Sequence, residues 1–154
     1  MVRLTEGARA PAFTLTNQRG EKVSLRDFKG QRVIVYFYPA DDTPGCTKEA
    51  CQFNDELAGL RALGVHVLGV SPDERTSHAA FAAKYGLDFD LLSDPSKKVM
   101  ERYGAWGEKM LYGKRVIGVI RSTFVVGPTG IIEHAWYAVR TDGHAHRVRE
   151  AIES

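Results

Sequence analysis

The stretch that decides the fold is an apolar run followed by a short polar turn, Val33-Ile34-Val35-Tyr36-Phe37-Tyr38-Pro39-Ala40-Asp41-Asp42-Thr43-Pro44-Gly45-Cys46. Its first six residues are nearly all β-branched or aromatic, which is typical of a strand buried on both faces of a sheet. Pro39 ends that strand because proline has no N–H for the strand ladder. Asp42 or Thr43 can then cap a helix that has Pro44 as its first residue. The stretch therefore predicts a buried strand that leads through a tight turn into a helix.

The residues that follow this stretch complete a βαβ unit. From Pro44 to Leu63 the apolar residues repeat at helical spacings of three and four, at Ala50, Phe53, Leu57 and Leu60. Gly64 ends the helix, and residues 65–70 form a second buried strand. A strand, a helix and a strand in this order predict two parallel strands joined by a crossover helix.

The rest of the chain supplies the outer elements of the same sheet. Alternating residues predict an N-terminal hairpin over 13–15 and 23–25, and a second hairpin over 123–126 and 131–137. Further helices are predicted over 74–85, over 95–103 with Asp94 as N-cap, and from about residue 143, while 106–114 is predicted to be irregular. Together these elements predict one α/β domain over residues 1–154, with a mixed central sheet, helices on both faces and an N-terminal β-hairpin.

Composition narrows the classes of function. The 154 residues include 21 basic and 19 acidic side chains, and a net charge of +2 is too small for the positive field that nucleic-acid binders use. The N-terminus has no secretory signal pattern, and the longest apolar run, residues 33–38, is too short to cross a bilayer. We therefore expect a cytoplasmic protein that binds neither membranes nor nucleic acid. Cysteines in a reducing compartment rarely form permanent disulfides. Cys46 and Cys51 therefore matter for their reactivity more than for their packing.

Cys46 falls in the first turn of the predicted helix. Unpaired backbone N–H groups and the helix dipole favour a thiolate there, and a cysteine in such a place beside a cation can titrate at about 3.5–7.5. Only the thiolate is nucleophilic. A buried structural cysteine is the alternative, but the cap, Pro44 and the small Gly45 favour a reactive one.

At these residues the chain resembles the peroxiredoxins. Pro39, Thr43 and Cys46 match the spacing Pro-x-x-x-Thr-x-x-Cys of the peroxidatic motif, and Arg121, in Arg121-Ser122-Thr123-Phe124, matches the arginine that completes it. Cys51 lies five residues after Cys46. The chain is most similar to the bacterioferritin comigratory protein, or peroxiredoxin Q, branch, which also carries a segment like Trp106-Gly107-Glu108-Lys109.

The resemblance implies a thioredoxin-like fold and a role for each matching residue. Cys46 would attack a hydroperoxide, hydrogen peroxide or an organic one, and Thr43 would orient the peroxide through its hydroxyl. Arg121 would donate hydrogen bonds and lower the pKa of the sulfur, while Pro39 would shield it from water. The backbone N–H groups of Gly45 and Cys46 would complete the donor set that binds the substrate.

Cys51 is the only other thiol in the chain. Attack on peroxide leaves a sulfenic acid, which a second thiol can condense into a disulfide. Five helical residues separate two Cα atoms by about 8–9 Å, whereas a disulfide needs them within about 7 Å. The start of the helix must therefore unwind before Cys46 and Cys51 can bond. Alternatively, Cys51 is a small filler residue in the helix.

Other assignments follow from the resemblance or compete with it. Family members recycle the disulfide with thioredoxin or a similar dithiol protein and need no metal, flavin or nicotinamide, and we expect a monomer because both thiols lie in one chain. A thiol-disulfide oxidoreductase is one rival, although it ordinarily carries Cys-x-x-Cys at the helix start. A non-enzymatic redox sensor or chaperone-like protein is another. We expect His144 and His146 on a solvated helix, and the resemblance places the segment of Trp106 near the site.

Overall fold

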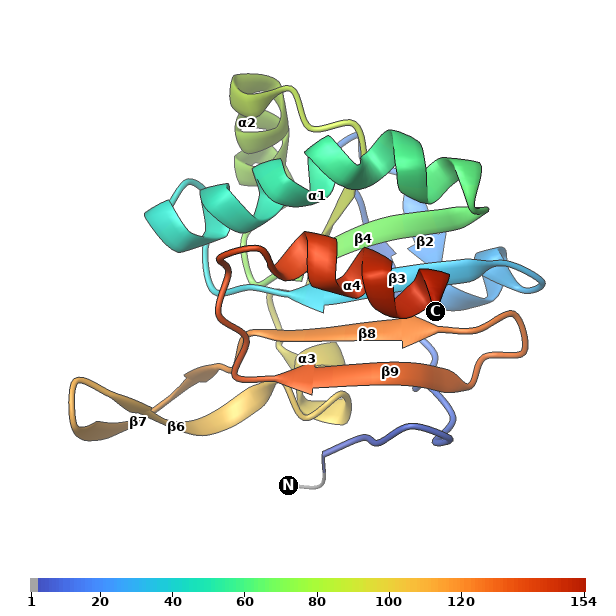
Figure 1. Ribbon diagram of the computed structural model, residues 1–154. Coiled ribbons are helices and arrows are strands. Elements are labelled where there is room, and N and C mark those ends of the chain that lie inside the picture. The colour runs from blue at the N-terminus through green and yellow to red at the C-terminus, as the bar shows by residue number, and fades with distance from the viewer. Residues whose placement is uncertain (1–2) are drawn as a thin grey trace.

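The computed structural model describes residues 3–154 and contains a seven-stranded mixed sheet in the order β2-β1-β5-β4-β3-β8-β9 (Figure 1). Strands β3, β4 and β5 are parallel, and the outer strands pair antiparallel to their neighbours. The strands are β1 (Thr14–Thr16), β2 (Lys22–Ser24), β3 (Arg32–Phe37), β4 (Val65–Ser71), β5 (Asp90–Ser93), β8 (Ser122–Val126) and β9 (Ile132–Tyr137).

Helices cover both faces of this sheet, as the sequence predicts. The helices are η1 (Leu25–Phe28), α1 (Pro44–Ala62), α2 (Arg75–Tyr85), α3 (Lys98–Arg102) and α4 (His144–Glu153). Apolar side chains of α1, α2 and α4 form one core cluster with alternate residues of β3, and those of α3 and η1 join a second cluster on the opposite face. Within residues 3–154, none of the helices combines the length and the hydrophobicity needed to span a bilayer.

Helices α1 and α4 lie side by side, with α4 against the second half of α1 (Figure 1). The guanidinium of Arg149 covers Gly59 so closely that a Cβ atom there would overlap with it. The same guanidinium donates to Glu56 over 2.9 Å. These contacts attach the C-terminal half of α1 to α4 and leave the half that carries Cys46 outside them.

The structure corrects two boundaries of the sequence analysis. The helix predicted over 95–103 begins only at Lys98, because Lys97 has a left-handed φ of 63°. Asp94 still binds its N-terminus, since its Oδ2 atom accepts the N–H of Met100 over 2.9 Å, but it is not the N-cap. The segment 106–114 is not irregular, because it contains β6 (Trp106–Leu111), which pairs antiparallel with β7 (Lys114–Val119).

Candidate active site

Cys46 lies at the carboxyl end of β3, in the first turn of α1. Thr43 is the N-cap and Pro44 the first helical residue, as predicted, which makes Cys46 the third residue of the helix. The first intrahelical bond runs from the Thr47 N–H to the Thr43 carbonyl over 2.8 Å, so the earlier N–H groups of the turn point outward from the helix end. The Cys46 side chain is buried, with 2% of its surface exposed.

The Thr43 side chain does not cap the helix. Its Oγ1 atom donates to the carbonyl oxygen of Ala40 over 2.9 Å, across the turn that joins β3 to α1. Because the hydroxyl hydrogen is used in this way, the lone pairs of Oγ1 remain available to accept a hydrogen bond. Thr43 is exposed, whereas Cys46 beside it is buried.

Arg121 joins the site from the far end of the sequence. It directly precedes β8, the antiparallel neighbour of β3. Its Nη2 atom donates to the Sγ atom of Cys46 over 3.2 Å, and its Nη1 atom donates to Oε1 of Glu49 over 2.6 Å. Burial opposes the charge of Arg121, but the neighbouring Glu49 and Cys46 outweigh burial and raise its pKa. A cation therefore faces the sulfur.

Gly45 lies beside this contact, and a Cβ atom there would stand 3.4 Å from the Nη2 atom of Arg121, in van der Waals contact with it. Pro39 is half-buried at the end of the β3 run, next to the turn that carries Thr43. The structure thus brings Pro39, Thr43, Gly45, Cys46 and Arg121 to one end of the sheet.

Glu49 is a site residue that the sequence analysis missed. It lies one turn after Cys46, is completely buried, and its Oε2 atom has no hydrogen-bond partner within the described residues. Burial raises the pKa of Glu49 to about 7, against the opposing effect of the Arg121 charge. An acidic residue placed three positions after Cys46, on the buried stripe of the helix, was the signal for it, since charged groups are buried only with a partner.

Cys51 shares α1 with Cys46 but points away from the core. Both cysteines are free thiols on one continuous helix, and Cys51 is partly buried beside the exposed Asp55. Burial, and to a lesser extent the Asp55 carboxylate, raises the pKa of the Cys51 thiol. Helix geometry places the two Cα atoms about 8–9 Å apart, too far for a disulfide while the helix is intact.

The sequence analysis also made predictions about the two histidines of α4 and about Trp106. His146 is exposed on α4 as predicted, but His144 is buried and bonds Thr123 Oγ1 over 2.8 Å, so the prediction of a solvated His144 is wrong. Burial lowers the pKa of His144 to about 4. Trp106 packs against the core cluster on the α3 face, whereas Cys46 belongs to the cluster on the α1 face.

The sequence and the fold of the chain have relatives among known proteins. The profile of the AhpC/TSA family matches residues 7–135. A Mycobacterium tuberculosis chain named as a peroxiredoxin is 54% identical over 150 residues, covering 97% of this chain and 96% of its own length. Peroxiredoxin Bcp of Escherichia coli is 46% identical over 141 residues, covering 92% and 90%.

A solved structure extends the likeness to three dimensions. The bacterioferritin comigratory protein of Xanthomonas campestris, studied for its alkyl peroxide reduction activity, matches with a TM-score of 0.88 at 38% identity. The match covers 99% of this chain and 96% of that one. It confirms the predicted α/β fold of the thioredoxin-like class.

Proposed function

We propose, from the fact that this chain belongs to the AhpC/TSA family and to its Bcp/peroxiredoxin Q branch, that Cys46 is the nucleophile of its peroxidase reaction. The chain is a thiol-dependent peroxidase, with a hydroperoxide as substrate and a thiol as reductant. The observation that carries our assignment is the 3.2 Å contact between Arg121 Nη2 and Cys46 Sγ. It gives the sulfur a partly buried cationic partner, which Cys51 lacks among residues 3–154.

In the proposed reaction the Cys46 thiolate attacks one oxygen of the peroxide bond. A sulfur–oxygen bond forms, the O–O bond breaks, and the departing oxygen leaves as water or an alcohol after it takes up a proton. Thr43 accepts a hydrogen bond from the peroxide through the lone pairs that its bond to Ala40 leaves available. Arg121 and the N–H groups of Gly45 and Cys46 stabilise the charge that builds on the oxygens in the transition state.

Cys51 then resolves the sulfenic acid on Cys46. The two condense with loss of water to a disulfide within one chain, which protects Cys46 from irreversible oxidation. Because the helix holds the cysteines too far apart, the first turns of α1 unwind for this step. Thioredoxin or a similar cytoplasmic dithiol protein reduces the bond by thiol–disulfide exchange, and the helix forms again.

We assign hydrogen peroxide and organic hydroperoxides as substrates, and a monomer as the working unit. The alkyl peroxide reduction activity of the Xanthomonas campestris relative supports the organic class. Both cysteines lie on α1 of the same chain, so no second copy is needed for either step. No metal or organic cofactor enters the scheme.

The alternatives explain the site less well. A thiol-disulfide oxidoreductase would place its second cysteine three positions after the first, but here the second follows after five and lies on another side of the helix. A redox sensor without turnover would need no recycling partner. Neither alternative requires a threonine hydroxyl and an arginine arranged around the sulfur.

Stopped-flow measurement of peroxide consumption by the reduced protein tests the proposal. With peroxide alone we expect about one equivalent to be consumed per chain, and with thioredoxin, thioredoxin reductase and NADPH we expect continuous turnover. A protein that consumes one equivalent but never turns over with any dithiol donor would favour the sensor. A protein that reduces disulfides and leaves peroxide untouched would favour the oxidoreductase.

A further inference from the structure

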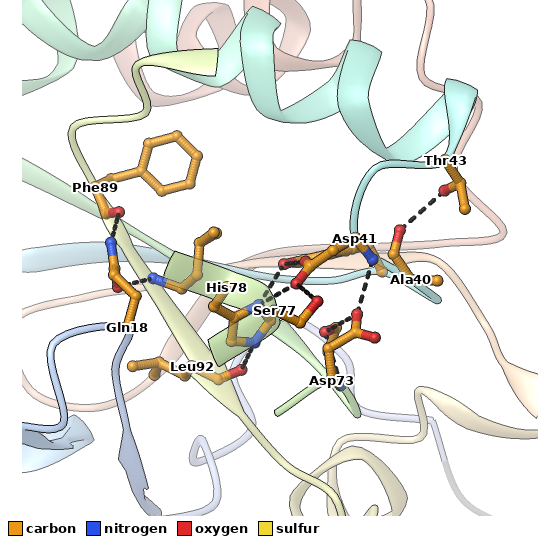
Figure 2. A network of polar contacts seen from close by, with 12 residues as sticks. Gln18, Ala40, Asp41, Thr43, Asp73, Ser77, His78, Phe89 and Leu92 are labelled. Atoms are coloured by element: carbon orange, nitrogen blue, oxygen red, sulfur yellow. Dashed lines mark hydrogen bonds and ion pairs between the residues drawn. The ribbon is translucent and has the colours of Figure 1, made fainter. Parts of the chain in front are cut away.

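A buried polar network lies beside the active-site turn and plays no part in the scheme above (Figure 2). Its centre is Asp41, whose side chain is only 5% exposed. The Oδ1 atom of Asp41 accepts the Tyr38 hydroxyl over 2.6 Å, and its Oδ2 atom accepts the Ser77 hydroxyl over 2.8 Å. The same Oδ2 atom lies 2.7 Å from Nδ1 of His78, and the Asp41 N–H donates to Asp73 over 2.7 Å.

The contacts of His78 fix its protonation. Its Nε2 atom lies 3.0 Å from the carbonyl oxygen of Leu92, which can only accept, so Nε2 carries a hydrogen. Its Nδ1 atom faces a carboxylate oxygen, which also accepts. The Asp41 carboxylate already accepts two hydroxyl hydrogens, from Tyr38 and Ser77, and so acts as an acceptor toward His78. Nδ1 therefore donates to Asp41, and both ring nitrogens of the completely buried His78 are hydrogen-bonded.

This hydrogen-bonded pair lies at the base of the turn that carries Thr43. The next residue, Asp42, has a left-handed φ of 55°, which is uncommon for a residue with a side chain. Its carboxylate binds the Lys84 ammonium over 2.7 Å and the Tyr85 hydroxyl over 2.6 Å. Two consecutive aspartates thus tie the turn to α2 at two places, one buried and one exposed. The shape of this turn directs the Thr43 hydroxyl to the carbonyl oxygen of Ala40.

We propose that His78 is a positioning residue for the peroxidase reaction: its N–H bond to Asp41 holds the turn 40–43 in the shape that presents Thr43 to the peroxide. The inference rests on the roles proposed for Cys46 and Thr43. His78 touches neither the sulfur nor the substrate in this scheme. It acts by linking α2, through Asp41, to the residues that do, and Leu92 of β5 fixes the other side of its ring.

The geometry explains why this link matters for rate and not only for stability. Catalysis depends on alignment of the sulfur, the O–O bond and the donors, and a displacement of about 1 Å can cost about 10²-fold. Cys46 is fixed by α1 and by Arg121. Thr43 instead lies in an exposed turn, and Asp41 is its nearest buried attachment. Loss of the bond between His78 and Asp41 should therefore move Thr43 more than Cys46.

Two isosteric substitutions separate positioning from simple packing. His78→Asn keeps an amide N–H near the position of Nδ1 and loses the bond to Leu92, whereas His78→Gln keeps an N–H near Nε2 and loses the bond to Asp41. Each variant loses one hydrogen bond of a buried ring, so each serves as the control for the other. For the rate of peroxide consumption in one turnover, we expect His78→Asn to stay within about threefold of wild type and His78→Gln to fall by about 10²-fold. Equal rates in the two variants, whether high or low, would overturn the proposal.

A measurement on the wild-type protein tests the pair without any turnover. In ¹⁵N NMR spectra the Nδ1 atom of His78 should resonate as a nitrogen that carries a hydrogen and donates it to Asp41, while the ring of His144, whose pKa burial lowers to about 4, should remain neutral in the same spectrum. An Nδ1 atom without a hydrogen in His78 would refute the N–H bond to Asp41 even if the Gln variant fails to fold. If the wild type proved unable to reduce peroxide, the proposed function would fail, and the spectrum would still decide whether the pair exists.

Discussion

The Nη2 atom of Arg121 lies 3.2 Å from the Sγ atom of Cys46, although 75 positions separate the two residues in the chain. The antiparallel pairing of β8 with β3 creates this contact, because it brings the start of β8 next to the end of β3, from which α1 departs. The second guanidinium nitrogen is held by Glu49 on the same helix as the sulfur. Arg121 therefore has its orientation fixed before a peroxide arrives.

Replacing Arg121 tests this arrangement. Arg121→Ala should slow the reaction of Cys46 with hydrogen peroxide by about 10²–10³-fold, the range found when one transition-state donor is removed. Arg121→Lys keeps a positive charge but cannot contact Cys46 and Glu49 with two fixed nitrogens. Its rate should therefore lie between those of the wild type and Arg121→Ala. Stopped-flow kinetics under single-turnover conditions measure both. A wild-type rate in Arg121→Ala would remove this residue from the mechanism.

Single cysteine variants should separate the two chemical steps. Cys46→Ser should lose turnover entirely, because the remaining thiol of Cys51 has no cationic partner in the part of the chain that the structure describes and lies beside the Asp55 carboxylate. Cys51→Ser should consume one equivalent of peroxide and then accumulate sulfenic acid or higher oxides on Cys46. Dimedone labelling followed by mass spectrometry distinguishes these products. Sustained turnover by Cys46→Ser would refute the assignment of the nucleophile.

Oxidation should also change the structure of α1. One equivalent of peroxide should give a bond between Cys46 and Cys51 within a single chain, with faster amide exchange in the first turns of α1 and unchanged exchange around Gly59. Reduction should restore the original pattern. Non-reducing mass spectrometry and hydrogen exchange on the same sample provide the measurement. A disulfide-linked dimer would show that Cys51 does not resolve within its own chain.

Glu49 should make the stability of the protein depend on pH. Its pKa is raised by burial to about 7, above its ordinary value of 4.5, so the folded state binds this proton more tightly than the unfolded state does. Stability due to Glu49 is therefore greatest below about pH 4.5 and is lost as the pH rises through 7. The free energy of unfolding of wild type minus that of Glu49→Gln should fall between pH 5 and pH 8.

The control for that measurement is Glu101→Gln, an exposed glutamate of α3. The difference in the free energy of unfolding between wild type and Glu101→Gln should not change over the same pH range. Urea denaturation at several pH values gives the free energies for both variants. A difference for Glu49→Gln that does not change with pH would show that Arg121 holds the Glu49 carboxylate ionised throughout.

Asp55 should slow the closing of the disulfide. Burial and the Asp55 carboxylate raise the pKa of Cys51, which lowers its thiolate fraction near neutral pH. Asp55→Asn should lower that pKa and speed disulfide formation at pH 7 by about two- to threefold. The exposed Asp88→Asn serves as the control. Quenched-flow alkylation of free thiols after a peroxide pulse measures the rate, and an unchanged rate would exclude the electrostatic effect.

The central βαβ unit was predictable because its signals are local. The buried run before Pro39, the apolar stripe of α1 and the glycine at position 64 each act within a few residues. The start of α3 was not predictable in this way, because it depends on the left-handed backbone of Lys97 and on a side chain of Asp94 that reaches six residues ahead. Neither feature leaves a periodic pattern.

Buried polar partners were the other part that sequence reasoning missed. Glu49 and His78 are both buried in the fold, and each pairs with a residue far away in the chain. The position of Glu49 on the apolar stripe of its helix hinted at burial, but the sequence did not indicate which residue would pair with it. Arg121 lies 72 positions from Glu49, and Asp41 lies 37 positions from His78. A single sequence carries the two members of such a pair but not their proximity.

The clamp formed by Arg149 over Gly59 has a consequence for the speed of the catalytic cycle. Starting a helix from a coil is unfavourable, because several backbone angles must be fixed before the first hydrogen bond forms, whereas lengthening an existing helix adds one bond for each residue ordered. In the proposed cycle, the second half of α1, held by α4, would serve as a template on which the first turns regrow after reduction. Regrowth by elongation takes about nanoseconds per residue. In that cycle, restoring the site around Cys46 would therefore not limit turnover, and the reaction of the disulfide with its reductant would set the rate.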